Sequence, residues 1–247
     1  VRDSIKGSTF NLFDRGFALG NTHKTTLLKQ SLAGSVQIEP NHKGLFLEPT
    51  QSINYIESHD NHTMWDKMAV CNSHEDEETR IKRHRLATSV ILLSQGIPFL
   101  HAGQEFFRTK GGEENSYKSP DSVNSLDWER KKRYEENVDY VSGLISLRKA
   151  HKALRLSTVT EIKKHVRFPY EKGSMLMYHL SDVKQYGKYN HFLIVFHNGT
   201  NTENVSLPLS GEWEVLVEGT IAGDSPIRKV NKEIQVPPIS TVVLAQY

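Results

Sequence analysis

The chain has 247 residues, with 31 Lys and Arg against 29 Asp and Glu, so its formal net charge is +2. The basic residues are scattered, and the sequence therefore lacks the basic patch that marks nucleic-acid-binding proteins. One cysteine, Cys71, excludes an internal disulfide framework and a four-thiolate zinc site, and apolar runs such as residues 90–93 are far too short for a membrane span.

The opening of the sequence predicts loops, one helix and a first strand. Residues 1–50 are loop-rich and are punctuated by Gly34, Pro40 and Gly44. One helix is predicted in this part, over residues 25–35. Residues 52–58 mix large apolar and short polar side chains and predict a buried strand. The chain begins at Val1 in a stretch already rich in Phe, Leu and Gly, so we expect a piece of a longer protein.

A helix and a second strand are predicted next. Three acidic residues at positions 76–78 favour a helix start, and apolar residues then recur every three or four positions until Gly96. Residues 97–102 predict a short apolar strand. Together with the first strand, this forms a strand, helix, strand unit of the kind that builds a parallel sheet.

The pattern changes in the second half of the chain. A polar loop over residues 108–126 is long enough to suggest a functional role, and a helix is predicted over residues 131–151. Short alternating runs separated by Gly, Pro and Asn then predict an antiparallel sandwich, with Phe192, Phe196 and Trp213 in its core. These strands are expected at residues 161–168, 174–180, 191–197, 204–208, 213–217, 233–236 and 241–245. We therefore expect two domains, residues 1–157 and residues 158–247.

The pair His59 and Asp60 is the first candidate site, because it directly follows the first predicted strand. Catalytic groups of parallel α/β proteins gather at the carboxyl ends of the strands. Enzymes that break glycosidic bonds place carboxylates and hydrogen-bonding groups around the sugar, so His59 could donate to a hydroxyl and Asp60 could accept from one. The alternative is an Asp that caps a turn beside a core histidine.

A second polar cluster, residues 101–110, follows the second predicted strand. If the two strands are adjacent and parallel, both clusters lie on the same rim. Trp65, Tyr117 and Trp128 offer flat faces suited to stacking on sugar rings, although each could equally serve in ordinary packing.

Three motifs in order resemble one family. Residues 55–67 (YIESHDNHTMWDK), 103–110 (GQEFFRTK) and 115–128 (NSYKSPDSVNSLDW) resemble type I pullulanase, the α-1,6 starch-debranching branch of the α-amylase superfamily. The opening residues 1–20 are also similar to the region upstream of that family's seventh barrel strand. The resemblance spans nearly the whole chain and is weakest in the predicted sandwich.

The resemblance implies a fold, a reaction and site residues. The fold class would be α/β plus all-β: the C-terminal part of a (β/α)₈ barrel followed by an antiparallel β-sandwich. The reaction would be hydrolysis of α-1,6 linkages with retention, in which Asp60 stabilises the transition state beside His59. Substrate contacts are implied for Asn61, Gln104, Glu105, Arg108, Asn115 and Tyr117. No cofactor or metal is implied, and calcium dependence cannot be inferred.

The sequence departs from the family because it lacks two catalytic carboxyls and is too short for a complete barrel. A retaining mechanism needs two carboxyls about 5 to 5.5 Å apart, and the family supplies both on earlier strands. A (β/α)₈ barrel of about 250 residues also cannot be built from the residues that precede the predicted sandwich. We therefore expect the C-terminal portion of an enzyme, inactive alone, whose partners are an α-glucan and the N-terminal remainder of the same enzyme.

Two other functions stay open at this point. The chain could be a glucan-binding module without catalysis, or a metal-dependent hydrolase that uses His59, Asp60, His62, His74 and His101. The compartment and the preferred glucan also stay open, with a lean toward the cytoplasm.

Overall fold

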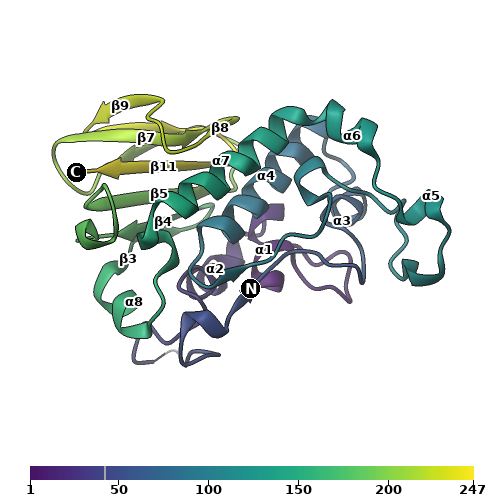
Figure 1. Cartoon of the computed structure of the whole chain (residues 1–247), viewed down its shortest axis with the longest axis horizontal. Helices are drawn as coiled ribbons and strands as arrows, with labels where there is room; N and C mark the ends of the chain where they lie inside the picture. The colour runs from purple at the N-terminus through teal and green to yellow at the C-terminus, as the bar shows by residue number, and fades with distance from the viewer. Residues whose placement is uncertain (42) are drawn as a thin grey trace.

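The computed structural model describes residues 1–41 and 43–247, and it places a layer of helices against one face of a large antiparallel sheet (Figure 1). None of the helices in these residues combines the length and apolarity needed to cross a bilayer. The helices are α1 (Arg2–Lys6), α2 (Thr25–Leu32), α3 (Met64–Cys71), α4 (Glu77–Leu93), α5 (Asp121–Asn124), α6 (Trp128–Arg133), α7 (Glu135–Ala150) and α8 (Val159–His165). Short 3₁₀ turns lie at Phe17–Leu19, Thr22–Lys24, Pro49–Gln51, Gln104–Phe106, Ser116–Lys118, Lys152–Arg155 and Lys184–Tyr186.

Among the described residues of the first half there is one strand pair, β1 (Ile53–Asn54) with β2 (Ile97–Pro98). The two strands run parallel, with Ile53 opposite Ile97, so the predicted strand, helix, strand unit is confirmed. Both strands are shorter than predicted because the residues that follow leave the ladder and form the polar segments described below. Membership of a barrel stays a prediction.

Helix α4 joins the two strands, and its ends follow the sequence signals. The Asp76 side chain accepts a hydrogen bond from the backbone N–H of Thr79 at 2.8 Å, and two acids occupy the first turn, as predicted. At the other end Gly96 has φ 100°, and a Cβ there would lie 3.0 Å from the carbonyl oxygen of Ser52. Glycine is therefore required where the helix returns to the strand pair.

The second half forms one large sheet and one small strand pair. The large sheet has the order β3-β4-β5-β11-β7-β8, with β9 also paired to β7, and the strand pair is β10 with β6. The predicted antiparallel pairing is confirmed. The strands are β3 (Val166–Lys172), β4 (Met175–Leu180), β5 (His191–His197), β6 (Glu203–Ser206), β7 (Glu212–Glu218), β8 (Ile221–Ala222), β9 (Arg228–Asn231), β10 (Glu233–Val236) and β11 (Ser240–Gln246).

The two faces of the large sheet bury different clusters. Phe192 and Phe196 lie in a hydrophobic cluster shared with α2, α4 and α7, whereas Trp213 lies in a second cluster covered by β6 and β10. The prediction that all three fill one core is therefore wrong for the two phenylalanines. The helix layer contacts the sheet closely: a Cβ at Gly143 of α7 would lie 2.0 Å from the carbonyl oxygen of Ala222. The domain boundary near residue 157 stays a prediction.

Two helices differ from the sequence prediction. Residues 159–165 form α8, not the start of a strand, because Thr158 and Glu161 form a capping box that nucleates a helix. Helix α3 was not predicted; its first turn is capped by Thr63, which accepts from the backbone N–H of Asp66 at 3.1 Å. Strands β8 and β9 were also missed, and the predicted helix over residues 131–151 is interrupted at Tyr134.

Candidate active site

The candidate site lies where β1 and β2 end. Because these strands are parallel neighbours, the segments that follow them meet at one rim, as predicted. Two surface features compose it. We call residues 58–63 the Asp60 turn and residues 108–126 the Tyr117 loop. Within the Tyr117 loop, α5 projects away from the body of the protein at the end farthest from the large sheet (Figure 1).

His59 and Asp60 are both open to solvent. Their side chains are 85% and 69% exposed, and the Nε2 atom of His59 lies 3.4 Å from an Oδ2 atom of Asp60. The next residue, Asn61, has φ 64°, a left-handed conformation that Asn tolerates better than most residues. The Asp60 carboxylate can therefore meet a ligand directly.

Glu57 lies beneath the turn and was not predicted as a site residue. Its side chain is fully buried; one oxygen accepts from the backbone N–H of Met64 at 2.6 Å, and the other lies 3.2 Å from Nδ1 of His101. Burial alone would raise the pKa of this carboxyl, but the hydrogen bonds from His101 and Met64 hold the pKa below its usual value. Glu57 therefore joins the Asp60 turn to the segment after β2.

Two buried lysines hold the turn from other sides. The Nζ atom of Lys110 donates to the carbonyl oxygen of His59 at 3.1 Å, and Nζ of Lys6 lies 3.4 Å from the carbonyl oxygen of His62. Burial lowers the pKa of both ammonium groups, that of Lys6 to about 8. The backbone N–H of Lys110 also donates to Asp66 at 2.8 Å, which fixes the start of the Tyr117 loop against α3.

Arg108, the first residue of the Tyr117 loop, connects His101 to Asn124 near the end of that loop. One guanidinium nitrogen lies 3.2 Å from Nε2 of His101, and another donates to the carbonyl oxygen of Asn124 at 2.7 Å. The Asn124 amide in turn donates to the carbonyl oxygens of Ser116 and Ser119. Arg108 is half-buried, so it anchors the loop and keeps part of its surface open.

The remaining predicted substrate residues differ in how far their side chains are exposed. Asn115 is exposed, and Tyr117 is 72% exposed with Nζ of Lys118 at 5.2 Å from its ring centroid, so both are open to a ligand. Glu105 is half-buried. Gln104 is fully buried and donates to Thr88 at 3.1 Å, so its side chain has no surface with which to contact a sugar.

The metal-dependent alternative requires several metal-binding side chains close together. Across residues 1–41 and 43–247, no group of three His, Cys, Asp or Glu side chains is placed to hold a metal ion. His101 is engaged with Glu57, and Nδ1 of His62 faces Glu114 at 3.8 Å.

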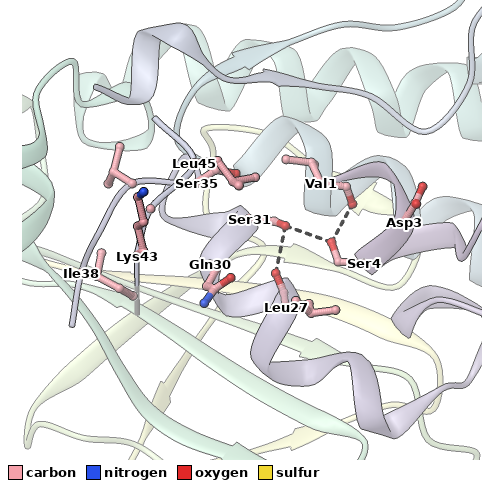
Figure 2. A pocket seen from close by; sticks show the side chains of 12 residues that line it. Val1, Asp3, Ser4, Leu27, Gln30, Ser31, Ser35, Ile38, Lys43 and Leu45 are labelled. Carbon is pink, nitrogen blue, oxygen red and sulfur yellow. Dashed lines mark hydrogen bonds between the residues drawn. The ribbon is translucent and has the colours of Figure 1, made fainter. Parts of the chain in front are cut away.

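A separate cavity lies near the start of the chain, where Val1, α1 and α2 converge with residues 35–38 and 43–45 (Figure 2). Hydrogen bonds between Ser4 and Ser31, and from these side chains to the carbonyl oxygens of Val1 and Leu27, line one wall. Its volume of about 150 Å³ is below the range of about 300 to 1,000 Å³ that is usual for ligand pockets. None of its residues belongs to the rim, so it is not part of the candidate site.

The sequence predicts the exposed residues of this candidate site but not the buried network between them. The one signal for it is an ionisable residue, Glu57, inside a segment that otherwise predicts a buried strand. A carboxylate at such a position needs a partner, and its partner His101 is 44 residues away in the sequence.

Comparisons with known proteins identify the family to which this chain is similar. The family model "Pullulanase, all-beta domain" matches residues 162–221. A pullulanase of Bacillus subtilis (strain 168) is 41% identical over 246 residues, which cover 98% of this chain and 34% of the relative. The chain thus spans about a third of the length of that relative.

Solved structures of pullulanases also match this chain over nearly its whole length. The crystal structure of pullulanase type I from Bacillus subtilis str. 168 complexed with maltose matches with a TM-score of 0.95 and 40% identity, covering 99% of this chain and 34% of that one. Pullulanase from Anoxybacillus sp. LM18-11 complexed with maltotetraose matches with a TM-score of 0.91 and 44% identity, covering 100% of this chain and 34% of that one.

Proposed function

Because this chain is homologous to pullulanases over nearly its whole length, we propose that it is the C-terminal portion of a pullulanase-type glycoside hydrolase. The complete enzyme would cleave α-1,6-glucosidic branch linkages in pullulan, starch or glycogen. The observation that carries this proposal is the parallel pairing of β1 with β2, which supports a shared rim for the Asp60 turn and the Tyr117 loop.

In this proposal Asp60 stabilises the transition state without attacking the sugar. Cleavage passes through an oxocarbenium-like state, and hydrogen bonds to ring hydroxyls tighten as that state forms. Asp60 is exposed and can accept such bonds, with His59 and Asn61 beside it. Arg108, Asn115 and Tyr117 would contact further sugar units along the rim.

The nucleophile and the acid/base would come from the preceding part of the enzyme. Retention needs two carboxyls about 5 to 5.5 Å apart that both reach the anomeric carbon. Glu57, the carboxylate nearest to the Asp60 turn in sequence, has no exposed surface and both its oxygens are engaged, so it is unsuited to attack. We therefore expect the chain alone to be inactive.

A binding function without catalysis is the second candidate, and the exposed rings of Tyr117 and Trp128 favour it. Affinity electrophoresis of the isolated chain in gels that contain pullulan or glycogen separates the two. Clear retardation supports the binding module, whereas little retardation supports a partial cleft.

The proposed reaction is tested on the complete enzyme that contains this segment. Release of reducing ends from pullulan, with no release from a glucan that has only α-1,4 linkages, is the expected result. A complete enzyme that leaves pullulan intact would contradict the proposal.

A further inference from the structure

The Asp60 turn is closed by a buried carboxylate. Glu57 precedes Asp60 by three residues and Met64 follows it by four, and the hydrogen bond of 2.6 Å between them brings the two ends of the turn together. We propose that Glu57 and His101 are positioning residues that hold the Asp60 turn and the Tyr117 loop in one fixed arrangement. This inference deepens the proposed function and rests on it.

Four links form a continuous path between the two features. Glu57 contacts His101, His101 contacts Arg108, and Arg108 donates to the carbonyl oxygen of Asn124. Asn124 then holds the backbone on both sides of Tyr117 through the carbonyl oxygens of Ser116 and Ser119. A shift at either end therefore changes the other end.

The chemistry of the partners fixes the tautomer of His101. A carboxylate only accepts hydrogen bonds and a guanidinium only donates them. His101 lies between the two, so its Nδ1 carries the proton that Glu57 accepts, and its Nε2 carries the lone pair that Arg108 needs. In the opposite tautomer, the Nε2–H group would face the N–H groups of Arg108, and the lone pair of Nδ1 would face the carboxylate of Glu57.

Burial makes this arrangement resistant to displacement. A carboxylate without exposed surface loses hydration, so a conformation that breaks either of its hydrogen bonds is costly. Lys110 and Lys6 add contacts to the carbonyl oxygens of His59 and His62. The Asp60 carboxylate is exposed and lies 3.4 Å from Nε2 of the likewise exposed His59, so its placement depends on the backbone held from below.

The substitution Glu57→Gln keeps the side-chain volume and breaks one link however the amide turns. If its oxygen faces Met64, its NH₂ faces His101 and forces the other tautomer. If its oxygen faces His101, its NH₂ opposes the backbone N–H of Met64. In the complete enzyme we expect kcat on pullulan to fall about 10- to 100-fold, the size of effect that a displacement of about 1 Å produces.

Two substitutions at His101 separate the halves of the path. In His101→Asn the amide can still donate to Glu57 but no acceptor faces Arg108, so KM is expected to rise several-fold with kcat little changed. In His101→Gln an acceptor still faces Arg108 but the donor to Glu57 is lost, so kcat is expected to fall as in Glu57→Gln. A role in stability alone would not divide the effects between KM and kcat.

His165 provides the matched control. It is buried, its Nδ1 lies 2.8 Å from the carbonyl oxygen of Ser181, and its Nε2 lies 3.1 Å from the Gln185 amide. His165→Asn and His165→Gln are expected to lower the melting temperature without changing kcat or KM. Wild-type kinetics in Glu57→Gln and in both His101 variants would overturn the proposal.

A second measurement needs no activity. Imidazole ¹⁵N shifts of the chain in mildly alkaline buffer, with His101 assigned through the signal lost in His101→Gln, report which ring nitrogen carries the proton. We expect Nδ1–H, and an Nε2–H tautomer would overturn the path. If the complete wild-type enzyme leaves pullulan intact, the proposed function fails, and the tautomer alone decides whether the path exists.

Discussion

At the scale of single residues, the candidate site combines one exposed carboxylate with several buried ionisable groups. Asp60 is open to a ligand, while Glu57, Lys6 and Lys110 hold the surrounding backbone from within the protein. The exposed group can therefore be changed with little effect on folding, and the buried groups cannot.

Asp60→Asn tests the role of the exposed carboxylate. The change keeps the volume but removes the charge that sugar hydroxyls and the developing positive centre require, so we expect debranching by the complete enzyme to fall by at least about 10³-fold. The melting temperature should be unchanged because the side chain is exposed. Asp139→Asn, at an exposed position on α7, is the control, and comparable activity in both variants would refute the role given to Asp60.

His84 makes a prediction about pH. It is fully buried against Phe107, neither ring nitrogen has a hydrogen-bond partner within the described residues, and burial lowers its pKa from 6.5 to about 4. Between these two values the unfolded chain binds a proton at this ring and the folded chain does not. The free energy of unfolding should therefore fall as the pH falls through this window, by up to roughly 3 kcal/mol from this group.

The variant His84→Leu should lose this part of the pH dependence, because it removes the titrating ring and no hydrogen bond. Denaturant unfolding at several pH values between 4 and 7 measures the difference. His23→Gln, at an exposed position, should keep the wild-type slope. An identical slope in His84→Leu and wild type would show that this ring does not titrate as argued.

At the scale of elements, α4 and α7 position β2 and the polar residues 101–110 that follow it. Helix α4 ends directly before β2, and its last carbonyl groups lack partners within the helix. The buried guanidinium of Arg148, on α7, donates to the carbonyl oxygens of Leu92, Ser94, Leu154 and Gly96 at 2.6 to 2.9 Å. One side chain therefore fixes the junction between α4 and β2.

We expect Arg148→Met to lower the free energy of unfolding by about 3 kcal/mol or more, because it leaves several buried carbonyl groups without a donor. Arg155→Met is the matched control: Arg155 also donates to two backbone carbonyl oxygens but is exposed, so its loss should cost under about 1 kcal/mol. Urea unfolding of both variants measures the difference. Equal costs would contradict the role given to burial.

Elements with strong local signals could be predicted from the sequence. Helix α4 begins at its predicted acidic cap, and β5 and β10 match their predicted bounds because Gly, Pro and Asn residues delimit them. Helix α8 lies where an alternating pattern predicts a strand, because the capping box of Thr158 and Glu161 favours a helix there. The burial of Gln104 and the path through Glu57 depend on contacts between distant segments, which no local pattern reports.

At the scale of the whole molecule, the strand pair of β1 and β2 leaves apolar side chains exposed. Within the described residues this sheet has two strands, and Ile53, Ile97 and Phe99, which directly follows β2, are 57%, 47% and 45% exposed. Unpaired strand edges with apolar side chains promote association. In the proposed complete enzyme, the preceding part of the barrel covers this edge.

We therefore expect the isolated chain to self-associate at high protein concentration, as measured by sedimentation velocity. Ile97→Lys places a charge on the edge and should reduce association. Leu27→Lys, an equivalent change at an exposed position on α2, should not. A wild-type chain that stays monomeric throughout the concentration series would argue against an uncovered edge.

We propose that this chain supplies the helper carboxylate of a debranching enzyme, and that the attacking carboxylate and the proton donor come from the preceding part of that enzyme. Hydrolysis of pullulan by the purified chain, with and without a separately produced N-terminal complement, tests it most directly. We expect no release of reducing ends by the chain alone and release once the complement is added. Sustained turnover by the chain alone would contradict it.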